Sequence, residues 1–331
     1  MHPFELTRRL VEIESITENE KEVALFLREF LAGLGYDASL QEAAPNRFNV
    51  LALAGKPDLV FTTHIDTVPP YIPFAEDEDY LYGRGTCDAK GIVAAQIHAA
   101  ETLRARGENR IGLLFVVGEE RNSAGAIHAN KTPLGSRFVI DGEPTENKLA
   151  IGTKGTLRLE ITTRGKAAHS AYPHTGESAI LKMLDLLQEL RGMQLPADHL
   201  LGESTCNIGT LNAGTKANVI PDRARAELMF RSVEPISRLK QRLETLVRGR
   251  AEIDYRFEVP VMMMNVAEGF ESAPVSFASD VPFLSNWGKP YLLGPGSILD
   301  AHTDHERISR KELLEGIDLY VRLAELLLTT P

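Results

Sequence analysis

Residues 58–66 read Asp-Leu-Val-Phe-Thr-Thr-His-Ile-Asp, a short apolar run that ends abruptly in polar residues. Such a run is typical of a strand that is buried on both faces of a parallel sheet. The side chains of His64 and Asp66 are two residues apart, so they point to the same side of an extended backbone. Open α/β sheets carry their sites at the carboxyl ends of strands. We therefore interpret this segment as a central strand with site residues at its end.

Two further apolar runs deliver acidic side chains in the same way. Residues 111–117 end at Glu119 and Glu120, and a shorter run ends near Asp141 and Glu143. Because helical patterns separate these strands along the chain, we expect the strands to pair in parallel, with helices on both faces of the sheet. The sequence thus predicts an α/β fold with a mostly parallel sheet.

Helical patterns flank the strands. Residues 4–36 predict two helices separated by a short break, residues 89–106 predict a third that is rich in alanine, and residues 311–328 predict a final one. Thr17 and Glu20 have the spacing of a capping box at the start of the second helix. These helices would cover the two faces of the predicted sheet.

The pattern changes after residue 153. Residues 155–164 alternate between polar and apolar side chains, as in a half-exposed strand. The elements that follow have the order β-α-β-β-α-β of a ferredoxin-like split unit. We predict one domain formed by residues 1–153 and 263–331, and an α+β domain inserted at residues 154–262.

Composition excludes several classes of protein. The formal net charge is −10, which argues against a protein that binds a nucleic-acid backbone. Cys87 and Cys206 are the two cysteines, so we expect a reduced, cytoplasmic protein without a disulfide framework. The first residues lack the apolar core of a signal peptide, and no apolar run approaches the length of a membrane span.

Histidines and carboxylates gather at strand ends and in adjoining loops. Each segment has an ordinary alternative: Asp88 could cap a helix, and Glu119–Glu120 could lie in an exposed loop. The glycines of residues 83–91 could suggest a phosphate loop, but the required Gly-x-x-x-x-Gly-Lys-Ser/Thr spacing is missing. Together with His64 and His302, these carboxylates suit two divalent metal ions, because zinc takes imidazole nitrogen and carboxylate oxygen.

Short motifs that contain or flank these histidines and carboxylates, or resemble them in type, occur along almost the whole chain. In order, they are THIDTVP (63–69), YGRGTCDAKG (82–91), GEE (118–120), GEPT (142–145), GKAAHS (165–170), NVIP (218–221) and GPGS (294–297), ahead of His302. In these motifs the chain resembles the M20 co-catalytic metallopeptidases, which include acetylornithine deacetylase, succinyl-diaminopimelate desuccinylase, aminoacylase and carboxypeptidase G2-type enzymes. The resemblance implies a zinc-exopeptidase-like catalytic domain, with the inserted domain as a lid or dimerisation domain.

The resemblance also implies a role for each residue of a two-metal site. Asp88 would bridge two Zn²⁺ ions, with Co²⁺ or Mn²⁺ as substitutes, and the peptide bond after it would be cis. Asp66 would orient His64, and Glu119 would be the general base. The implied metal ligands are His64, Asp88, Glu120, Glu143 and His302.

Two details of the ligand set stay open. The relatives use either an aspartate or a glutamate as one ligand, and both Asp141 and Glu143 are present here. The Gly-Glu-Pro-Thr context favours Glu143. The family's usual Asp-Glu pair after the last histidine ligand appears here as His305-Glu306, which leaves the surroundings of His302 open.

The inserted domain supplies the implied substrate contacts. His169 would stabilise the oxyanion, a role that relatives fill from the opposite subunit of a dimer. Asn218 and Arg231 resemble residues that hold a substrate carboxylate, and arginine suits bidentate binding; the alternative for Arg231 is a solvent-facing strand residue. Gly296 could let backbone N–H groups approach the same carboxylate.

The resemblance predicts a metal-dependent amidohydrolase that removes an N-acetyl or N-succinyl group from an amino acid such as N-acetylornithine or N-acetylcitrulline. A dipeptidase, aminopeptidase or aminoacylase of the same family is one alternative, and a non-catalytic metal-dependent binding protein is another. Glu119 argues against the second, because binding alone needs no base beside the metals. The expected partners are a small substrate and a second copy of the chain, in a homodimer formed through the inserted domain, with no nucleic acid or membrane.

Overall fold

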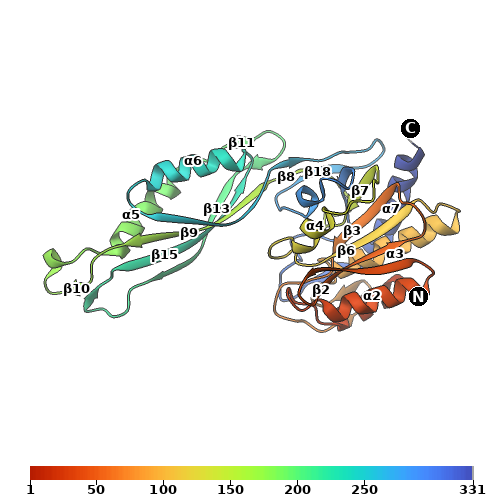
Figure 1. Ribbon diagram of the computed structural model, residues 1–331, viewed down its shortest axis with the longest axis horizontal. Helices are drawn as coiled ribbons and strands as arrows, with labels where there is room; N and C mark the ends of the chain where they lie inside the picture. Colours follow the sequence, from red (N-terminus) through yellow and green to blue (C-terminus); the bar gives the residue numbers. More distant parts are fainter. Residues whose placement is uncertain (330–331) are drawn as a thin grey trace. The chain divides into compact units, whose positions relative to one another are not determined.

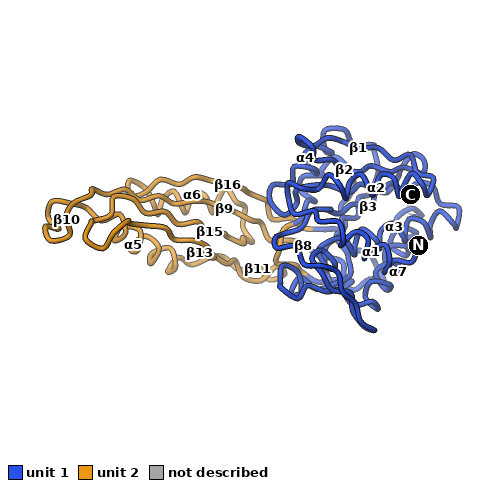
Figure 2. Tube along the Cα trace, turned by 90° about the horizontal axis from the view of Figure 1, so that it is seen from below, with its two compact units in different colours: residues 1–151, 264–273, 279–331 blue, residues 152–263, 274–278 orange. Residues whose placement is uncertain are grey.

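The computed structural model describes residues 1–329 and divides into two compact units (Figure 2). Unit 1 consists of residues 1–151, 264–273 and 279 onward, and unit 2 consists of residues 152–263 and 274–278. Among the residues that the structure describes, no helix is both long and apolar enough to cross a membrane.

Unit 1 is built on a six-stranded mixed sheet (Figure 1). Its strands are β1 (Asp37–Ala44), β2 (Arg47–Leu53), β3 (Leu59–His64), β6 (Ile111–Val116), β7 (Phe138–Asp141) and β19 (Lys289–Leu292). In the spatial order β1-β2-β6-β3-β7-β19, the last four strands run parallel, whereas β2 pairs antiparallel with both of its neighbours. The predicted α/β fold is confirmed, and the β1–β2 hairpin is its antiparallel edge.

Apolar cores form on both faces of this sheet. Successive side chains of a strand point to opposite faces, so Phe61 packs into the larger core and Val60 into the smaller one. The larger core takes side chains from α1 (Pro3–Glu12), α2 (Lys21–Gly33), α3 (Lys90–Ala105) and α7 (Arg310–Thr329). The smaller core takes them from α4 (Ala124–Ala129) and the short 3-10 helix η2 (Val281–Leu284). Burial on both faces explains why the β3 sequence is apolar throughout.

The capping box predicted at Thr17 and Glu20 is wrong. Glu20 precedes α2 but makes no side-chain capping bond, and its carboxylate instead pairs with the buried guanidinium of Arg47. The Thr17 hydroxyl donates to Asp66 over 2.8 Å. A buried charged partner outweighs a local cap here, because hydrogen bonds to charged groups contribute more than neutral ones.

Unit 2 is an antiparallel sheet covered by two helices on one face. The elements, in chain order, are β9 (Gly155–Arg164), α5 (Ala179–Arg191), β13 (Thr205–Ala213), β15 (Arg223–Ser232), α6 (Ile236–Val247) and β16 (Glu252–Val259). This is the expected β-α-β-β-α-β order, and the strands pair in the order β13-β15-β9-β16. Leu157, Leu159, Ile161, Leu228 and Phe230 form its core together with the helices.

Short strands complete the structure. A three-stranded sheet joins β4 (Ala75–Glu76), β5 (Tyr80–Tyr82) and β20 (Arg307–Ser309), and another joins β8 (Leu149–Thr153), β17 (Met262–Met263) and β18 (Ser272–Val275). Two-stranded ladders join β10 (Ala168–His169) to β14 (Val219–Ile220) and β11 (Ala197–Asp198) to β12 (Gly202–Glu203). A 3-10 turn, η1 (Pro173–Thr175), follows β10.

Candidate metal centre

Three neighbouring parallel strands of unit 1 bring the predicted acidic and imidazole side chains to one edge of the sheet. β3 ends at His64, β6 leads into Glu119 and Glu120, and β7 leads into Glu143. Since parallel strands end on the same side, residues distant in sequence meet there.

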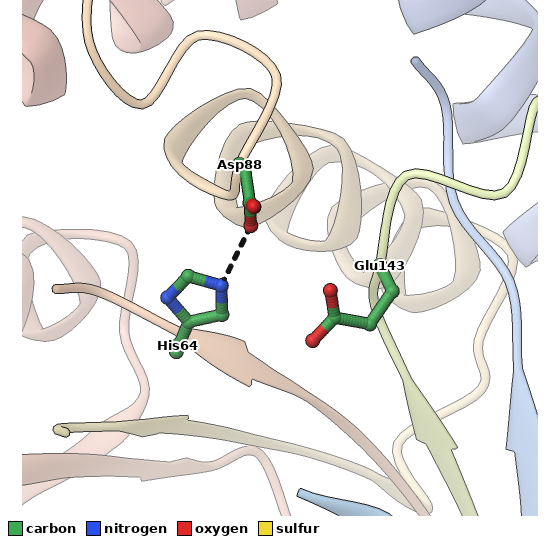
Figure 3. A group of neighbouring side chains, drawn as sticks. All are labelled: His64, Asp88 and Glu143. Atoms are coloured by element: carbon green, nitrogen blue, oxygen red, sulfur yellow. Dashed lines mark hydrogen bonds and ion pairs between the residues drawn. The ribbon is translucent and has the colours of Figure 1, made fainter. Parts of the chain in front are cut away.

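The first ligand group consists of His64, Asp88 and Glu143 (Figure 3). One potential ligand atom from each lies within 4.8 Å of the others, and all three residues are buried. The His64 Nε2 and the Asp88 Oδ1 are 2.8 Å apart. Asp88 precedes Ala89, the N-cap residue of α3, so it does not cap the helix itself, and the peptide bond from Asp88 to Ala89 is cis, as the resemblance implies.

The second ligand group consists of Asp88, Glu120 and His302. The His302 Nε2 lies 2.9 Å from the Glu120 Oε1 and 3.3 Å from the Asp88 Oδ2. The His302 side chain is 48% exposed, so this group opens toward solvent, whereas the first group is closed. Asp88 offers one oxygen to each group, which is the arrangement needed by a ligand shared between two ions.

Buried carboxylates crowd this region. Burial raises the pKa of Glu143 well above its usual range, and the neighbouring charges of Glu119 and Asp88 raise it further. Burial also raises the pKa of Glu120, and the charge of Asp88 adds to that shift. Ionised carboxylates this close and this poorly hydrated need a compensating positive charge.

The two imidazoles face these carboxylates. Burial disfavours the charged form of His64, but hydrogen bonds with Asp66 and Asp88 raise its pKa well above the usual value. Hydrogen bonds with Asp88 and Glu120 raise the pKa of His302 to about 10. A metal ligand must be the neutral imidazole, so a divalent ion bound here would take the place of these protons. Imidazole nitrogens with carboxylate oxygens are the donors that zinc uses, so both groups fit a divalent ion.

Asp66 holds the turn after β6 as well as contacting His64. Its Oδ1 accepts from the backbone N–H groups of Gly118 (2.9 Å) and Glu119 (3.1 Å), and its Oδ2 accepts from that of Glu120 (3.3 Å). The His64 Nδ1 lies 2.9 Å from the backbone carbonyl of Asp66 and 3.6 Å from its carboxylate. The carboxylate therefore anchors the segment that carries the predicted base and one predicted ligand.

Glu119 belongs to neither ligand group, but its carboxyl group interacts electrostatically with members of both. Burial raises the pKa of its carboxyl group well above the usual value, His64 opposes this rise, and the charges of Asp280, Glu120 and Asp88 add to it. A glutamate with a raised pKa is suited to taking and returning a proton near neutral pH.

The structure separates the two candidate acidic ligands that follow β7. Glu143 belongs to the first ligand group, and Asp141 does not. The glycine between them is required by packing, because a Cβ at Gly142 would lie 2.5 Å from the Gln96 Nε2 and 3.0 Å from the Tyr320 hydroxyl. The geometry thus favours Glu143 as the ligand.

In unit 2 the structure brings His169 and Asn218 together. β10 pairs with β14, so His169 lies opposite Val219, and the Ser170 N–H donates to the Asn218 carbonyl over 3.1 Å. Both His169 and Asn218 are exposed, and Tyr172 packs edge-on against the His169 ring.

Arg231 belongs to the four-stranded sheet of unit 2. It stands near the end of β15, where it pairs with Thr156 of β9, and its Nη1 donates to the Thr156 hydroxyl over 2.6 Å. Asn218 precedes the start of β15 at Arg223. Eight residues of extended strand span about 26 Å. Asn218, which lies just before the start of β15, and Arg231, near its end, therefore lie toward opposite ends of that strand.

Gly296 has a packing role of its own. Its φ of +91° lies in the left-handed region, and a Cβ there would lie 2.6 Å from the Cys87 Sγ. Glycine is thus needed for the GPGS turn to approach the segment that carries Asp88.

Two buried carboxylates of this region were not predicted as site residues. Asp280 precedes η2, and burial raises its pKa to about 7. Glu306 contacts the segment before Asp88. Neither residue stands at the end of a predicted strand. No sequence pattern therefore indicated that Asp280 belongs to the site, and Glu306 was noticed only because it lies shortly after His302.

The model of peptidase family M20/M25/M40 matches residues 60–326. The chain belongs to this family. A peptidase M20 domain-containing protein of Schizosaccharomyces pombe is 40% identical, covering 96% of this chain and 83% of that protein. A probable carboxypeptidase of Aspergillus flavus is 38% identical, covering 96% and 88% of the two chains.

Solved structures share the fold of this M20 chain. A tripeptidase from Staphylococcus aureus superposes with a TM-score of 0.81 at 24% identity, covering 96% of both chains. A dinuclear metal binding peptidase from Bacillus subtilis superposes with a TM-score of 0.73 at 16% identity, covering 99% and 98% of the two chains. The chain is therefore a metallopeptidase-family hydrolase that acts on amide bonds.

Proposed function

We propose that this M20 hydrolase cleaves an amide bond whose amino side is an amino acid with a free carboxylate. The substrate that its motifs favour is an N-acetyl or N-succinyl amino acid, such as N-acetylornithine or N-acetylcitrulline. The observation that carries the proposal is the pair of ligand groups that share Asp88, with Glu119 interacting electrostatically with members of both.

A second candidate is a carboxypeptidase or dipeptidase. The name of the Aspergillus flavus relative, a probable carboxypeptidase, favours it. Both candidates share one substrate core, an acyl group joined through nitrogen to an amino acid with a free carboxylate. They differ in whether the acyl group is a simple acid or another amino acid.

The residues of unit 1 supply the reaction steps. We propose that His64, Asp88 and Glu143 hold one Zn²⁺ and that Asp88, Glu120 and His302 hold the other, with Co²⁺ or Mn²⁺ as substitutes. When bound, such ions polarise the substrate carbonyl and acidify water. Glu119 accepts the proton of the attacking water and passes it to the leaving nitrogen. Asp66 keeps Glu119 in place through the backbone of its turn.

We further propose that the working enzyme is a homodimer through unit 2. Leu181 and Leu184 of α5 are 62% and 49% exposed, and Leu211 is 49% exposed on β13, an edge strand. Such an apolar surface beside an open strand edge favours association with another copy. A dimer would also allow both residues to contact the same substrate, because Asn218 could come from one chain and Arg231 from the other.

A substrate panel tests the reaction. We expect release of amine from N-acetylornithine and none from its carboxamide analogue, because the free carboxylate is required. Faster cleavage of an N-acylated dipeptide than of any N-acyl amino acid would favour the carboxypeptidase. Cleavage of an aminoacyl anilide, which has no carboxylate, would refute the proposal, as would metal binding without turnover of any compound.

Mixing two inactive variants tests the dimer. In the proposed dimer, each site combines Glu119 of one chain with His169 of the other. A dimer of one Glu119→Ala chain and one His169→Ala chain would therefore contain one site in which both residues are intact. We expect activity to return after the two proteins are unfolded together and refolded. A monomer in solution, or a mixture as inactive as its parts, would refute the shared site.

A further inference from the structure

The segment that presents Asp88 has an unusual backbone. It connects β5 to α3, and Gly83 and Gly85 adopt φ values of +129° and +90°. A Cβ on Gly85 would lie 2.9 Å from the Thr67 Cγ2, so this residue also approaches its neighbours closely. Such a segment has few local hydrogen bonds of helix or sheet, and its N–H groups need other acceptors.

One carboxylate accepts from three of these N–H groups. The Glu306 Oε1 accepts from the N–H groups of Gly85 (2.9 Å), Cys87 (3.1 Å) and Asp88 (3.0 Å). Its Oε2 accepts from the Arg84 Nη1 over 2.6 Å. Glu306 is 1% exposed, so each of these bonds is made away from water. Hydrogen bonds to a buried ionised carboxylate are stronger and more geometrically demanding than neutral ones.

Glu306 also connects the segments that carry His302 and Asp88, two members of the second ligand group. It lies four residues after His302 and directly before β20. β20 pairs with β5, opposing Arg307 to Tyr82, and the Gly83 N–H donates to the Glu306 carbonyl over 3.0 Å. Backbone and side chain together thus fix the His302 segment against the one that ends in Asp88.

We propose that Glu306 is a positioning residue that sets the Asp88 carboxylate for both ligand groups. This rests on the proposed metal centre. A purely structural role, as the buried partner of Arg84, would affect folding stability alone. The N–H of Asp88 is itself among the donors, so loss of the acceptor displaces the residue that both groups share.

Two substitutions distinguish the effect of the side-chain length of Glu306 from the effect of its two hydrogen-bond acceptors. In Glu306→Gln one carboxylate oxygen becomes an amide NH₂, which must face either the backbone N–H groups or Arg84, and both are donors. Glu306→Asp keeps both acceptors on a shorter side chain. Loss of a group that orients a metal ligand lowers affinity about 10–100-fold. We expect that loss in the glutamine variant and a smaller one in the aspartate variant.

A matched control is available in Glu20→Gln. Glu20 is likewise buried and pairs with a buried arginine, Arg47, but it accepts from no N–H group of residues 83–88. This variant removes a buried ion pair of similar kind, so it should lower the free energy of unfolding to a similar degree. Its affinity for Zn²⁺ should stay within about threefold of the wild type, since loss of an orienting group costs 10-fold or more.

The experiment is a titration of Zn²⁺ into the chelator-treated full chain, followed by calorimetry, with urea unfolding measured in parallel. Amide hydrogen exchange of residues 85–88 in the metal-free proteins gives a second readout. We expect Glu306→Gln to lose affinity and to exchange faster at these amides, while Glu20→Gln does neither. Equal Zn²⁺ affinity in the wild type and in Glu306→Gln would overturn the inference. A wild type that binds no Zn²⁺ would instead overturn the proposed metal centre.

Discussion

In the absence of divalent ions, the free energy of unfolding of the chain should decrease as the pH rises from 5 to 7. The group with the clearest contribution is Asp280, which is 2% exposed and whose pKa is raised by burial from 3.8 to about 7. Between these two values the carboxyl group of the unfolded chain is ionised while that of the folded chain keeps its proton. Its contribution to stability is therefore complete below pH 3.8 and is lost as the pH rises through 7.

The size of the effect follows from that shift. One proton bound only by the folded state changes stability by about 1.4 kcal/mol per pH unit. Because the slope decreases as the pH approaches the folded pKa, Asp280 alone accounts for a loss of about 2 kcal/mol between pH 5 and 7. The raised pKa values of Glu119 and Glu143 act in the same direction. The loss assigned to Asp280 is a large fraction of the about 5–15 kcal/mol that stabilises a typical domain.

Urea unfolding of chelator-treated protein at pH 5, 6 and 7 measures this loss. Asp280→Asn is the matched control, and we expect its stability to fall by about 2 kcal/mol less over the same interval. Zn²⁺ should reduce the decrease in the wild type, because the positive charge of bound cations favours the ionised form of the buried carboxylates. A metal-free chain whose stability is constant or increases from pH 5 to 7 would contradict the predicted electrostatics, as would an unchanged slope in the variant.

Three substitutions test other parts of the site, and a fourth, Gly33→Ala, is a control. Glu119→Ala should keep Zn²⁺ affinity and lose nearly all turnover; full activity would falsify its assignment as the base. Asp66→Asn turns a donor toward the Glu120 N–H, which should cost about 1–3 kcal/mol in urea unfolding. Its kcat should fall about 100-fold, since a displacement of about 1 Å can have that effect; an unaltered kcat would exclude the anchoring role. Gly91→Ala should weaken Zn²⁺ binding, because its Cβ would lie 2.2 Å from the Thr86 carbonyl oxygen. Gly33→Ala, in open space near the end of α2, should instead raise the unfolding midpoint slightly, and equal effects of the two would contradict the contact.

Much of unit 1 could be predicted because its strands are strongly marked. β3 and β6 are buried on both faces and are therefore apolar throughout, and the polar residues after them stand out. The edge hairpin of β1 and β2 has no such contrast, because no residue of β1 is fully buried. Its antiparallel pairing was consequently not apparent from the sequence.

Residues that act through tertiary contacts were harder to predict. Three of the donors to Asp66 are backbone N–H groups, which carry no signal in the sequence. The same is true of Glu306, whose donors lie more than 200 residues earlier in the chain. The separation of Asn218 from Arg231 depends on the length and register of β15, which a motif comparison does not contain.

The sharing of Asp88 has a consequence for how the site fills. The first ion to arrive would polarise the common carboxylate and place a positive charge beside the vacant position, so the second should bind more weakly. Because such coupling is reciprocal, neither position has an affinity of its own apart from the state of the other. When metal is scarce, most molecules would carry a single ion, and activity would lag behind total occupancy before rising steeply.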